Sequence, residues 1–233
     1  MQPVGANMTT IGLIGSGHIG SAIARLALAG GHQVVLSNRR GPESLAPLVA
    51  ELGEGARADT VLGAAAAGDI VVVTIPLRAI PDVPAEPLVG KIVIDTNNYY
   101  SGRDGVIPEL EADRLTVSEW VQQHLSGSRI VKAFNNIASQ HLGSLARPAG
   151  AADRSALIIA GDDVAAKEAV VAFLDSIGYD ALDAGALAEG RRFQKETPAY
   201  GLPYFESATE PGPGTPADVA VLQKALAAFA QAA

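Results

Sequence analysis

The feature that most constrains the fold is a glycine-rich turn near the N-terminus, within residues 9–31 (TTIGLIGSGHIGSAIARLALAGG). The apolar run Ile11–Ile14 before the turn fits a buried strand, and apolar residues at steps of four and three after it have the spacing of one helix face. At such a strand-to-helix turn, Gly15 allows a tight reversal, Gly17 lets the backbone approach a pyrophosphate, and Gly20 lets helix and strand pack closely. The pattern predicts a dinucleotide-binding turn, the alternative being a purely structural glycine turn.

The residues after the second expected strand, His32–Ser37, indicate which dinucleotide binds. Binding of NAD usually needs an acidic residue about 20 positions after the glycines, where it accepts hydrogen bonds from the ribose. This chain has Asn38, Arg39 and Arg40 there instead. A carboxylate would repel a 2′-phosphate, whereas a guanidinium can bind one through two parallel hydrogen bonds. The pattern favours NADP(H), the alternative being two arginines that are merely solvated in a loop.

Short apolar runs that alternate with helical segments predict an α/β fold of the Rossmann type, with a doubly wound, mostly parallel sheet and a small C-terminal βαβ extension. The clearest run, Asp69–Ile75, lacks polar alternation, as is typical of a strand buried on both faces. The other expected strands are Ile11–Ile14, His32–Ser37, Ala56–Ala58, Lys91–Asp95, Arg129–Phe134, Ser155–Ala160 and Tyr179–Leu182. Helices are expected after Gly17, over 43–52, 60–67 and 117–125, after Asp162 or Asp163, and from Thr215-Pro216 to about Phe229.

We expect two parts in the chain: an NADP-binding domain over residues 1–150 and a small lobe over 151–233 that packs on it and completes the pocket of the redox acceptor. Within the second part, the irregular stretch 191–214 is rich in aromatic residues, glycine and proline. It is either a lid or pocket wall, or a loop that packs against the core.

Polar residues follow several of the expected strands. Two strands end in a pair of asparagines, Asn97-Asn98 and Asn135-Asn136. Because the carboxyl ends of parallel strands meet at one edge, these pairs are expected to share a site with the glycine turn. Amides can orient a planar polar ligand without net charge, but they are also common in turns. Pro76, after Asp69–Ile75, is likewise either a ligand contact or a strand stop.

Composition excludes several classes of function. Hydrophobic residues make up 48% and charged residues 18%, so the chain is globular in type. A net charge of −8 without a basic run argues against nucleic acid or an anionic membrane as partner. No cysteine is present, and no apolar run approaches the ~20 residues that span a bilayer, so a cytoplasmic protein is expected.

Few residues of catalytic type stand out. The four histidines lack metal-ligand spacing, so no metal site is expected, and Tyr-x-x-x-Lys and Gly-x-Ser-x-Gly are absent. Hydride transfer between two carriers that each hold the chemistry in their own rings needs proximity and orientation more than a protein acid or base. The chain is therefore compatible with a reductase of a flavin-like acceptor.

Several motifs resemble a known family. GLIGSGHIGSAIA, SNRR, VVVTIP and AGDDVAAKEAVVAFLDSIGYDALDAGAL resemble the NADP oxidoreductases that reduce the deazaflavin coenzyme F420. DTNNYY and VKAFNNIAS also resemble the NADPH-binding domain of metalloreductases that reduce ferric and cupric ions through flavin. The matches cover about residues 9–190, and the segment after Arg191 has no counterpart.

The resemblance implies an NADP-dependent oxidoreductase that transfers hydride between NADP(H) and coenzyme F420, or a flavin such as FMN or FAD. A small-molecule redox acceptor and a second copy of the chain, in a homodimer, are the expected partners. The implied site residues are Ser16, Gly17, His18 and Ile19 at the pyrophosphate, with Gly15 and Gly20 shaping the turn; Asn38, Arg39 and Arg40 at the 2′-phosphate; Ile75, Pro76 and Arg78 beside the cofactor; and Asn97 and Asn135 near the nicotinamide.

Two other functions stay open. The first is reduction of a small imine or carbonyl compound, with Tyr99, Tyr100 or Tyr204 as proton donor. The second is a non-catalytic NADP(H)-binding sensor whose acidic, irregular tail binds a partner.

Overall fold

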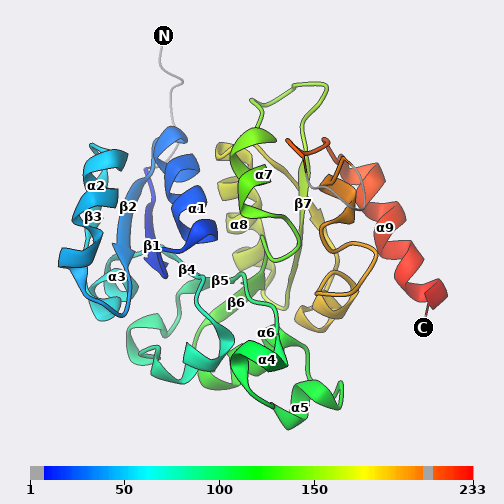
Figure 1. The fold of residues 1–233 in the computed structure, drawn as a ribbon, viewed down its shortest axis with the longest axis horizontal. Helices are drawn as coiled ribbons and strands as arrows, with labels where there is room; N and C mark the ends of the chain where they lie inside the picture. The colour runs from blue at the N-terminus through cyan, green and yellow to red at the C-terminus, as the bar shows by residue number, and fades with distance from the viewer. Residues whose placement is uncertain (1–7, 207–211, 233) are drawn as a thin grey trace.

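The structure is a computed structural model that describes residues 8–206 and 212–232 of the chain. One sheet has the strand order β3-β2-β1-β4-β5-β6-β7-β8 (Figure 1). The six strands from β3 to β6 are parallel, β7 is antiparallel to β6, and β8 is parallel to β7. The strands are β1 (Thr10–Ile14), β2 (Gln33–Ser37), β3 (Ala56–Ala58), β4 (Ile70–Val73), β5 (Ile92–Asp95), β6 (Arg129–Lys132), β7 (Ala156–Gly161) and β8 (Asp180–Asp183). The predicted α/β fold with a doubly wound, mostly parallel sheet is confirmed.

The order of the strands reverses between β1 and β4, and ligands of such sheets bind outside the carboxyl ends of the strands at this point. The described α-helices are α1 (His18–Ala29), α2 (Ala46–Leu52), α3 (Val61–Ala67), α4 (Ser101–Asp104), α5 (Pro108–Glu111), α6 (Val117–His124), α7 (Ser139–Ser144), α8 (Val164–Ser176) and α9 (Val219–Ala232). Short 3₁₀ helices are η1 (Pro42–Leu45), η2 (Leu77–Asp82), η3 (Glu86–Leu88), η4 (Leu187–Arg192) and η5 (Leu202–Tyr204).

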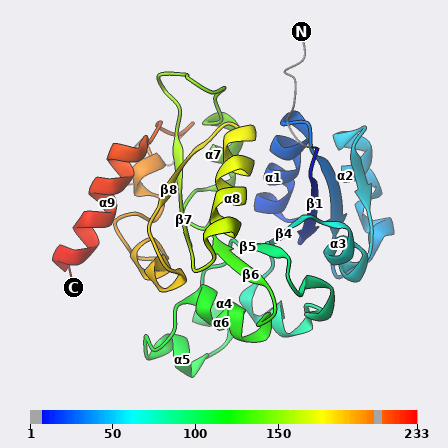
Figure 2. The same ribbon diagram turned by 180° about the vertical axis from the view of Figure 1, so that it is seen from behind.

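The sheet has an apolar core on each face. Alternate strand residues such as Leu13 and Val72 pack with α1, α7, α8 and α9 on one face. Their neighbours, such as Ile14 and Val73, pack with α3, α5 and α6 on the other. Figure 2 shows α8 beside α1, and the Ser176 Oγ of α8 lies 2.8 Å from Nε2 of His32 just before β2. Burial on both faces explains why the central strands are apolar throughout.

The C-terminal βαβ unit extends the main sheet. Val131 and Lys132 of β6 pair with Gly161 and Ala160 of β7. Buried residues of the last 80 positions belong to the same apolar cluster as Ile11 of β1. In Figure 1 the unit and α9 lie at the opposite end of the sheet from β3. The division of the chain at residue 150 stays a prediction.

Two helix starts differ from those expected, each for a local reason. The last helix begins at Val219 rather than at Thr215-Pro216, and the Asp218 carboxylate accepts a hydrogen bond from the Val221 N–H at 2.9 Å. The expected helix over 43–52 is a 3₁₀ turn followed by α2, with Pro47 in the first turn of α2, where its missing N–H costs nothing. The helix expected over 117–125 begins at Val117 as predicted, and Thr116 caps it through a capping box with Glu119.

No helix in the described ranges 8–206 and 212–232 is long and apolar enough to cross a membrane.

Candidate functional site

The glycine turn has the geometry that its sequence requires. Gly15 follows β1 with a φ of +113°, and a Cβ there would lie 2.3 Å from the carbonyl oxygen of Thr74, which follows β4. A Cβ at Gly20 would lie 2.3 Å from the Gly15 carbonyl oxygen, so only glycine lets α1 sit this close to the turn. A Cβ at Gly17 would meet nothing within 4 Å. The backbone is therefore closely packed at Gly15 and Gly20, whereas the space beside the Cα atom of Gly17, called here the space above Gly17, is open.

The first turn of α1 faces this open side. Gly17 is the N-cap residue, and no side chain within the described residues caps the helix. The first amides of a helix have no partner within the helix, and together with the helix dipole they attract anions. His18 is exposed as the first helical residue, whereas Ile19 packs partly buried against the core. The helix end is thus available to a phosphate group.

Asn38 connects the glycine turn to the loop that follows β2. Its side-chain amide donates hydrogen bonds to Ser16 Oγ at 3.3 Å and to Ser44 Oγ at 3.0 Å. Its carbonyl oxygen accepts from the Arg40 backbone N–H at 2.8 Å and from the Ser44 hydroxyl at 3.1 Å. The side chain predicted to contact a 2′-phosphate is therefore the one that fixes the shape of the arginine loop.

Arg39 and Arg40 differ from the other arginines of the protein. Both are exposed, and neither guanidinium group has a hydrogen-bond or ion-pair partner among the residues that the structure describes. Every other arginine side chain makes at least one such contact. Two cations without a partner among the described residues therefore lie at the carboxyl end of β2. The neighbouring strand, β1, carries the glycine turn. This arrangement suits a phosphate group beyond the pyrophosphate.

Ile75, Pro76 and Arg78 follow β4 on the other side of the switch point. Ile75 is partly buried against the core, and Pro76 precedes η2. The Arg78 guanidinium donates to the Arg103 carbonyl oxygen, and its backbone N–H donates to Asp104 at 3.4 Å. Arg78 therefore joins η2 to α4 in addition to bordering the edge of the sheet.

Asp104 holds this junction. Its side chain is buried and accepts hydrogen bonds from the Arg103 guanidinium at 2.8 Å and from the Tyr100 N–H at 3.1 Å. Burial by itself would raise the pKa of the Asp104 carboxyl, but the hydrogen bonds from Arg103 and Tyr100 bring that pKa below its ordinary value. The carboxylate is thus ionised in the folded protein at neutral pH.

The two asparagine pairs meet, as expected of parallel strands. The Asn98 side chain donates to the Asn135 carbonyl oxygen at 2.8 Å, and the Asn135 side chain donates to Asn98 Oδ1 at 3.3 Å. Asn135 is 5% exposed, and its Oδ1 has no hydrogen-bond partner in the part of the chain that the structure describes. Phe134 just before it has a φ of +61°, a strained conformation for an aromatic residue.

Asn97 has a different environment from Asn98. Its side-chain amide donates to Asp95 Oδ1 at 2.8 Å, which directs it below the edge of the sheet. Of the two residues predicted near the nicotinamide, Asn135 therefore has a free acceptor atom, and Asn97 is engaged within the protein. Asn98, which the sequence did not distinguish from Asn97, is the contact partner of Asn135.

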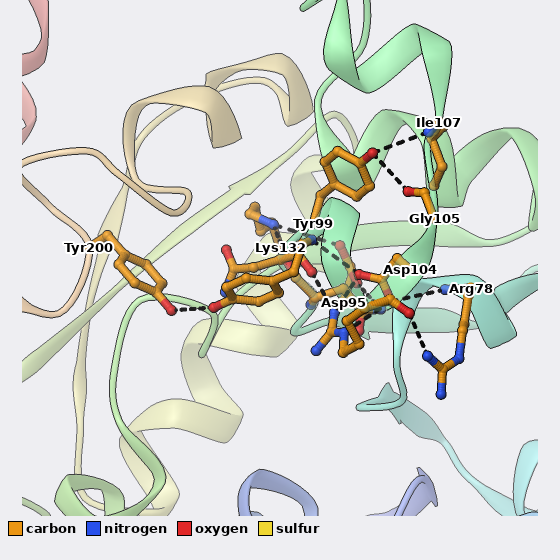
Figure 3. A network of polar contacts seen from close by, with 12 residues as sticks. Arg78, Asp95, Tyr99, Asp104, Gly105, Ile107, Lys132 and Tyr200 are labelled. Atoms are coloured by element: carbon orange, nitrogen blue, oxygen red, sulfur yellow. Dashed lines mark hydrogen bonds and ion pairs between the residues drawn. The ribbon is translucent and has the colours of Figure 1, made fainter.

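The sequence did not predict a buried polar network that lies below these turns (Figure 3). Lys132 Nζ donates to the Asn97 carbonyl oxygen at 2.9 Å and to Ser118 Oγ at 3.2 Å, and lies 3.8 Å from Asp95 Oδ2. Ser118 in turn donates to Asp95 Oδ2 at 2.6 Å. Lys132, Asp95 and Ser118 are all fully buried. Burial lowers the pKa of Lys132, and the carboxylate of Asp95 opposes that effect.

A signal for this network was present in the sequence. Asp95 ends one expected strand and Lys132 lies within another, and in the structure they are direct partners in the register of β5 and β6. A buried acid and a buried base on adjacent strands need each other as counter-ions. The sequence did not show that β5 and β6 are neighbours in the sheet, so the pairing of these two residues could not be predicted.

The C-terminal segment closes the same edge of the sheet. The Asn135 and Asn136 side chains donate to the carbonyl oxygens of Phe193 at 2.9 Å and Ala199 at 3.1 Å, and the Gly201 N–H donates to the Asn136 carbonyl oxygen at 2.9 Å. Residues 193–201 are therefore tied to the asparagine turns. The predicted wall or lid over 191–214 falls partly outside the described residues, because 207–211 are not among them.

The tyrosines considered as proton donors have distinct environments. Tyr204 is fully buried and donates to the Ala156 carbonyl oxygen at 2.8 Å. The Tyr99 hydroxyl lies 2.9 Å from the Gly105 carbonyl oxygen (Figure 3). It also lies 2.7 Å from Glu111 Oε1. The Tyr100 hydroxyl lies 2.7 Å from that of Tyr200 in the C-terminal segment. Tyr204 and Tyr99 are thus occupied by structural contacts.

These features define a class of protein. A Rossmann-type sheet, an open helix N-terminus above Gly17, arginines after β2 without a partner among the described residues, and paired amides on the same edge are the features expected of a dinucleotide-binding protein. No cluster of three or more potential metal ligands occurs in the residues that the structure describes. The arrangement is suited to orienting two ring systems rather than to acid–base or metal chemistry.

Comparison with known proteins narrows the class. Residues 10–99 match the model of the family described as "NADP oxidoreductase coenzyme F420-dependent". The F420-dependent NADP reductase of Methanocaldococcus jannaschii is 29% identical over 199 residues, which are 79% of this chain and 86% of that protein. The metalloreductase STEAP3 of Rattus norvegicus is 25% identical over 185 residues, which are 79% of this chain but only 35% of that protein.

Among solved structures, protein SMa0349 of Sinorhizobium meliloti is 29% identical with a TM-score of 0.69, over 81% of this chain and 91% of that one. The resemblance predicted from the motifs to the coenzyme F420-dependent NADP oxidoreductases is confirmed. The assignment of the chain to the oxidoreductases is confirmed with it.

Proposed function

We propose that this protein transfers hydride between NADP(H) and a deazaflavin, coenzyme F420, or a flavin. The observation that carries the choice of NADP(H) is a pair of exposed guanidinium groups, Arg39 and Arg40, beside the N-terminus of α1. Neither group has a partner in the part of the chain that the structure describes. Guanidinium groups that lack a partner in the protein are suited to a second, terminal phosphate. NADH, which lacks the 2′-phosphate, would leave them unused.

The residues of this chain fit the cofactor at three points. The space above Gly17 accommodates a pyrophosphate against the first amides of α1, and Ser16, His18 and Ile19 complete that turn. Arg39 and Arg40 would bind the 2′-phosphate, in a loop held by Asn38. The free Oδ1 of Asn135 would accept a hydrogen bond from the carboxamide of the nicotinamide, fixing which ring face is presented.

When bound, NADPH supplies the hydride, and the protein supplies position. The amides of Asn98 and Asn135 hold each other, so the edge beside the nicotinamide is rigid before the cofactor arrives. Lys132 fixes the backbone of the Asn97 turn from below. Rigid positioning of two reactants accounts for a large part of the acceleration in such reactions. No protein acid is required at the ring atom that receives the hydride.

The choice of acceptor rests on the relatives. The protein of Methanocaldococcus jannaschii is named an F420-dependent NADP reductase, and that of Rattus norvegicus a metalloreductase. The C-terminal tail, which has no counterpart in the motifs of the family, borders the site through its contacts to Asn135 and Asn136. The tail is therefore the part of the chain that would select among deazaflavin and flavin acceptors.

The test is an NADPH oxidation assay with coenzyme F420, FMN and FAD in turn, followed by the absorbance of NADPH. We expect turnover with at least one of them and a clear preference for NADPH over NADH. Absence of turnover with all three would refute the proposal. Tight NADPH binding in the same preparation without turnover would favour the sensor hypothesis instead.

One observation keeps reduction of a small imine or carbonyl compound as a second candidate. Tyr100 lies two residues from Asn98. Its hydroxyl is hydrogen-bonded to the hydroxyl of Tyr200 and not to a backbone group of the described residues. A proton donor for an imine or carbonyl would be available there. A panel of cyclic imines and ketones in the same assay distinguishes the two candidates. The homodimer and the cytoplasmic location stay predictions.

A further inference from the structure

A hollow of about 780 Å³ is lined by residues other than those assigned to NADP(H). It is lined by Tyr100, Tyr200, Leu202 and residues 195–198. The charges within it compensate each other, because Lys195 pairs with Glu196 at 2.5 Å. A lining of this kind suits an uncharged planar ring rather than a phosphate group.

The hollow adjoins the place where the nicotinamide would lie. Tyr200 stands between Ala199 and Gly201, both of which are hydrogen-bonded to Asn136. On the other side, Arg103 donates from its guanidinium to the Asn98 carbonyl oxygen at 2.9 Å. The same guanidinium lies 4.7 Å from the centre of the Tyr100 ring and fixes its orientation. Both tyrosines are therefore held within a few residues of the Asn98–Asn135 contact.

The two hydroxyl groups carry one hydrogen more than their contact uses. They lie 2.7 Å apart, so one O–H donates to the other. Each phenol has one hydrogen, and the accepting phenol keeps its own. Neither hydroxyl has a second hydrogen-bond partner in the described ranges 8–206 and 212–232. A free O–H donor is therefore left at the wall of the hollow.

Tyr200 stays protonated at neutral pH. Burial and the hydrogen bond with Tyr100 raise the pKa of the Tyr200 hydroxyl above its ordinary value. Its hydrogen is thus retained at neutral and mildly alkaline pH, and the contact between the two hydroxyl groups persists. The pair can act as a fixed hydrogen-bond donor to a bound molecule.

We propose that the hollow binds the ring system of the flavin-type acceptor and that the Tyr100–Tyr200 pair donates a hydrogen bond to the ring atom on which negative charge collects during reduction. This inference rests on the proposed function. In the reaction a C–H bond of NADPH breaks, both electrons leave with the hydrogen, and NADPH is oxidised to NADP⁺. A new bond to the transferred hydrogen forms on the acceptor ring, C–H in a deazaflavin and N–H in a flavin. The ring gains the electron pair, and water supplies the proton that neutralises it. A hydrogen bond aimed at the developing charge stabilises the transition state.

The test removes both hydroxyl groups and keeps both rings. Tyr100→Phe/Tyr200→Phe is expected to lower kcat/KM for the acceptor by at least about tenfold and to weaken binding of the oxidised acceptor by a similar factor. NADPH affinity should stay within about twofold, because the pair makes no contact with that site. Each single variant keeps one hydroxyl and is expected to lose less. Binding is measured by fluorescence titration with FMN and with coenzyme F420, at saturating NADP⁺.

Tyr99→Phe is the matched control, because its hydroxyl contacts Glu111 and Gly105 outside the hollow. It should leave acceptor binding unchanged. Leu202→Trp tests the hollow without touching a hydroxyl: Leu202 is 52% exposed, so a larger side chain would fold and obstruct the ring. An increase in acceptor KM of about tenfold without a change in NADPH affinity is expected.

The outcomes separate the inference from the proposed function. Turnover by the wild-type protein together with unchanged acceptor KM, kcat and affinity in the double variant overturns the inference and keeps the function. No turnover, but ring binding that the double variant loses, refutes the function and supports the site. If neither FMN nor coenzyme F420 binds to the wild-type protein, the inference is wrong.

Discussion

The two sides of the switch point are built differently. On the side of β1 and β2, three polar groups have no partner among residues 8–206 and 212–232: the N-terminus of α1, Arg39 and Arg40. On the side of β5 and β6, polar groups are buried and bind each other, as Lys132 does with Asp95 and Ser118. The first side is ready for a ligand, whereas the second maintains the shape of the edge. Changes to the second side should therefore cost stability, and changes to the first side should cost binding.

The largest effect is expected at Lys132. Lys132→Met leaves the buried Asp95 carboxylate without its counter-ion and should lower the free energy of unfolding by about 3–5 kcal/mol. Chemical denaturation measures the change. Asp95→Asn/Lys132→Met should recover part of the loss because no uncompensated charge remains. Lys224→Met, at an exposed position of α9, serves as the control. A loss below ~1 kcal/mol at Lys132 would contradict the distinction between the two sides.

The glycine turn allows a sharper comparison, since one site contains both kinds of position. Gly20→Ala brings a Cβ within 2.3 Å of the Gly15 carbonyl oxygen and should cost about 1–3 kcal/mol of stability. Gly17→Ala meets no atom within 4 Å and has ordinary backbone angles, so it should fold normally. It should nevertheless weaken NADPH binding by at least about tenfold by obstructing the pyrophosphate. Thermal unfolding and calorimetric titration provide the two readouts. If Gly17→Ala lost as much stability as Gly20→Ala, the space above Gly17 would be filled by the protein and not open to a ligand.

A smaller effect is expected at Asp104. Its pKa is lowered in the folded state, so its contribution to stability is complete above the unfolded value of 3.8 and is lost as the pH falls below it. Asp104→Asn should cost about 1–2 kcal/mol near neutral pH. The difference from the wild-type protein should shrink as the pH falls below about 4. Denaturation curves between pH 7 and pH 3 test this, and a difference that grows toward acid would have the wrong sign.

Sequence alone predicted the first side better than the second, for a physical reason. The glycine turn and the arginines after β2 lie within about thirty residues of each other, and their spacing reflects one local unit. The meeting of Asn98 with Asn135 also followed, because parallel strands share an edge. Which of Asn97 and Asn98 would face Asn135 depends on the turn after β5, which has no periodic pattern.

The network and the hollow required the fold itself. Lys132 and Asp95 meet only because β5 and β6 are neighbours in register. Tyr200 reaches Tyr100 across 100 positions of sequence, through a segment without regular structure. Such a segment carries turn residues but no spacing that fixes its destination. For this reason the sequence showed that residues 191–214 are rich in aromatic residues, but not which residues they contact.

The most direct test of the central claim is calorimetric titration of the wild-type protein, Arg39→Ala, Arg40→Ala and the double variant with NADPH and with NADH. Each charge-assisted contact to the 2′-phosphate is worth about tenfold or more in affinity. Arg57→Ala removes a guanidinium that Asp59 already binds and is the matched control. We expect the double variant to lose about 100-fold in affinity for NADPH and less than about twofold for NADH. Equal losses for both nucleotides, or a wild-type preference for NADH, would contradict this expectation.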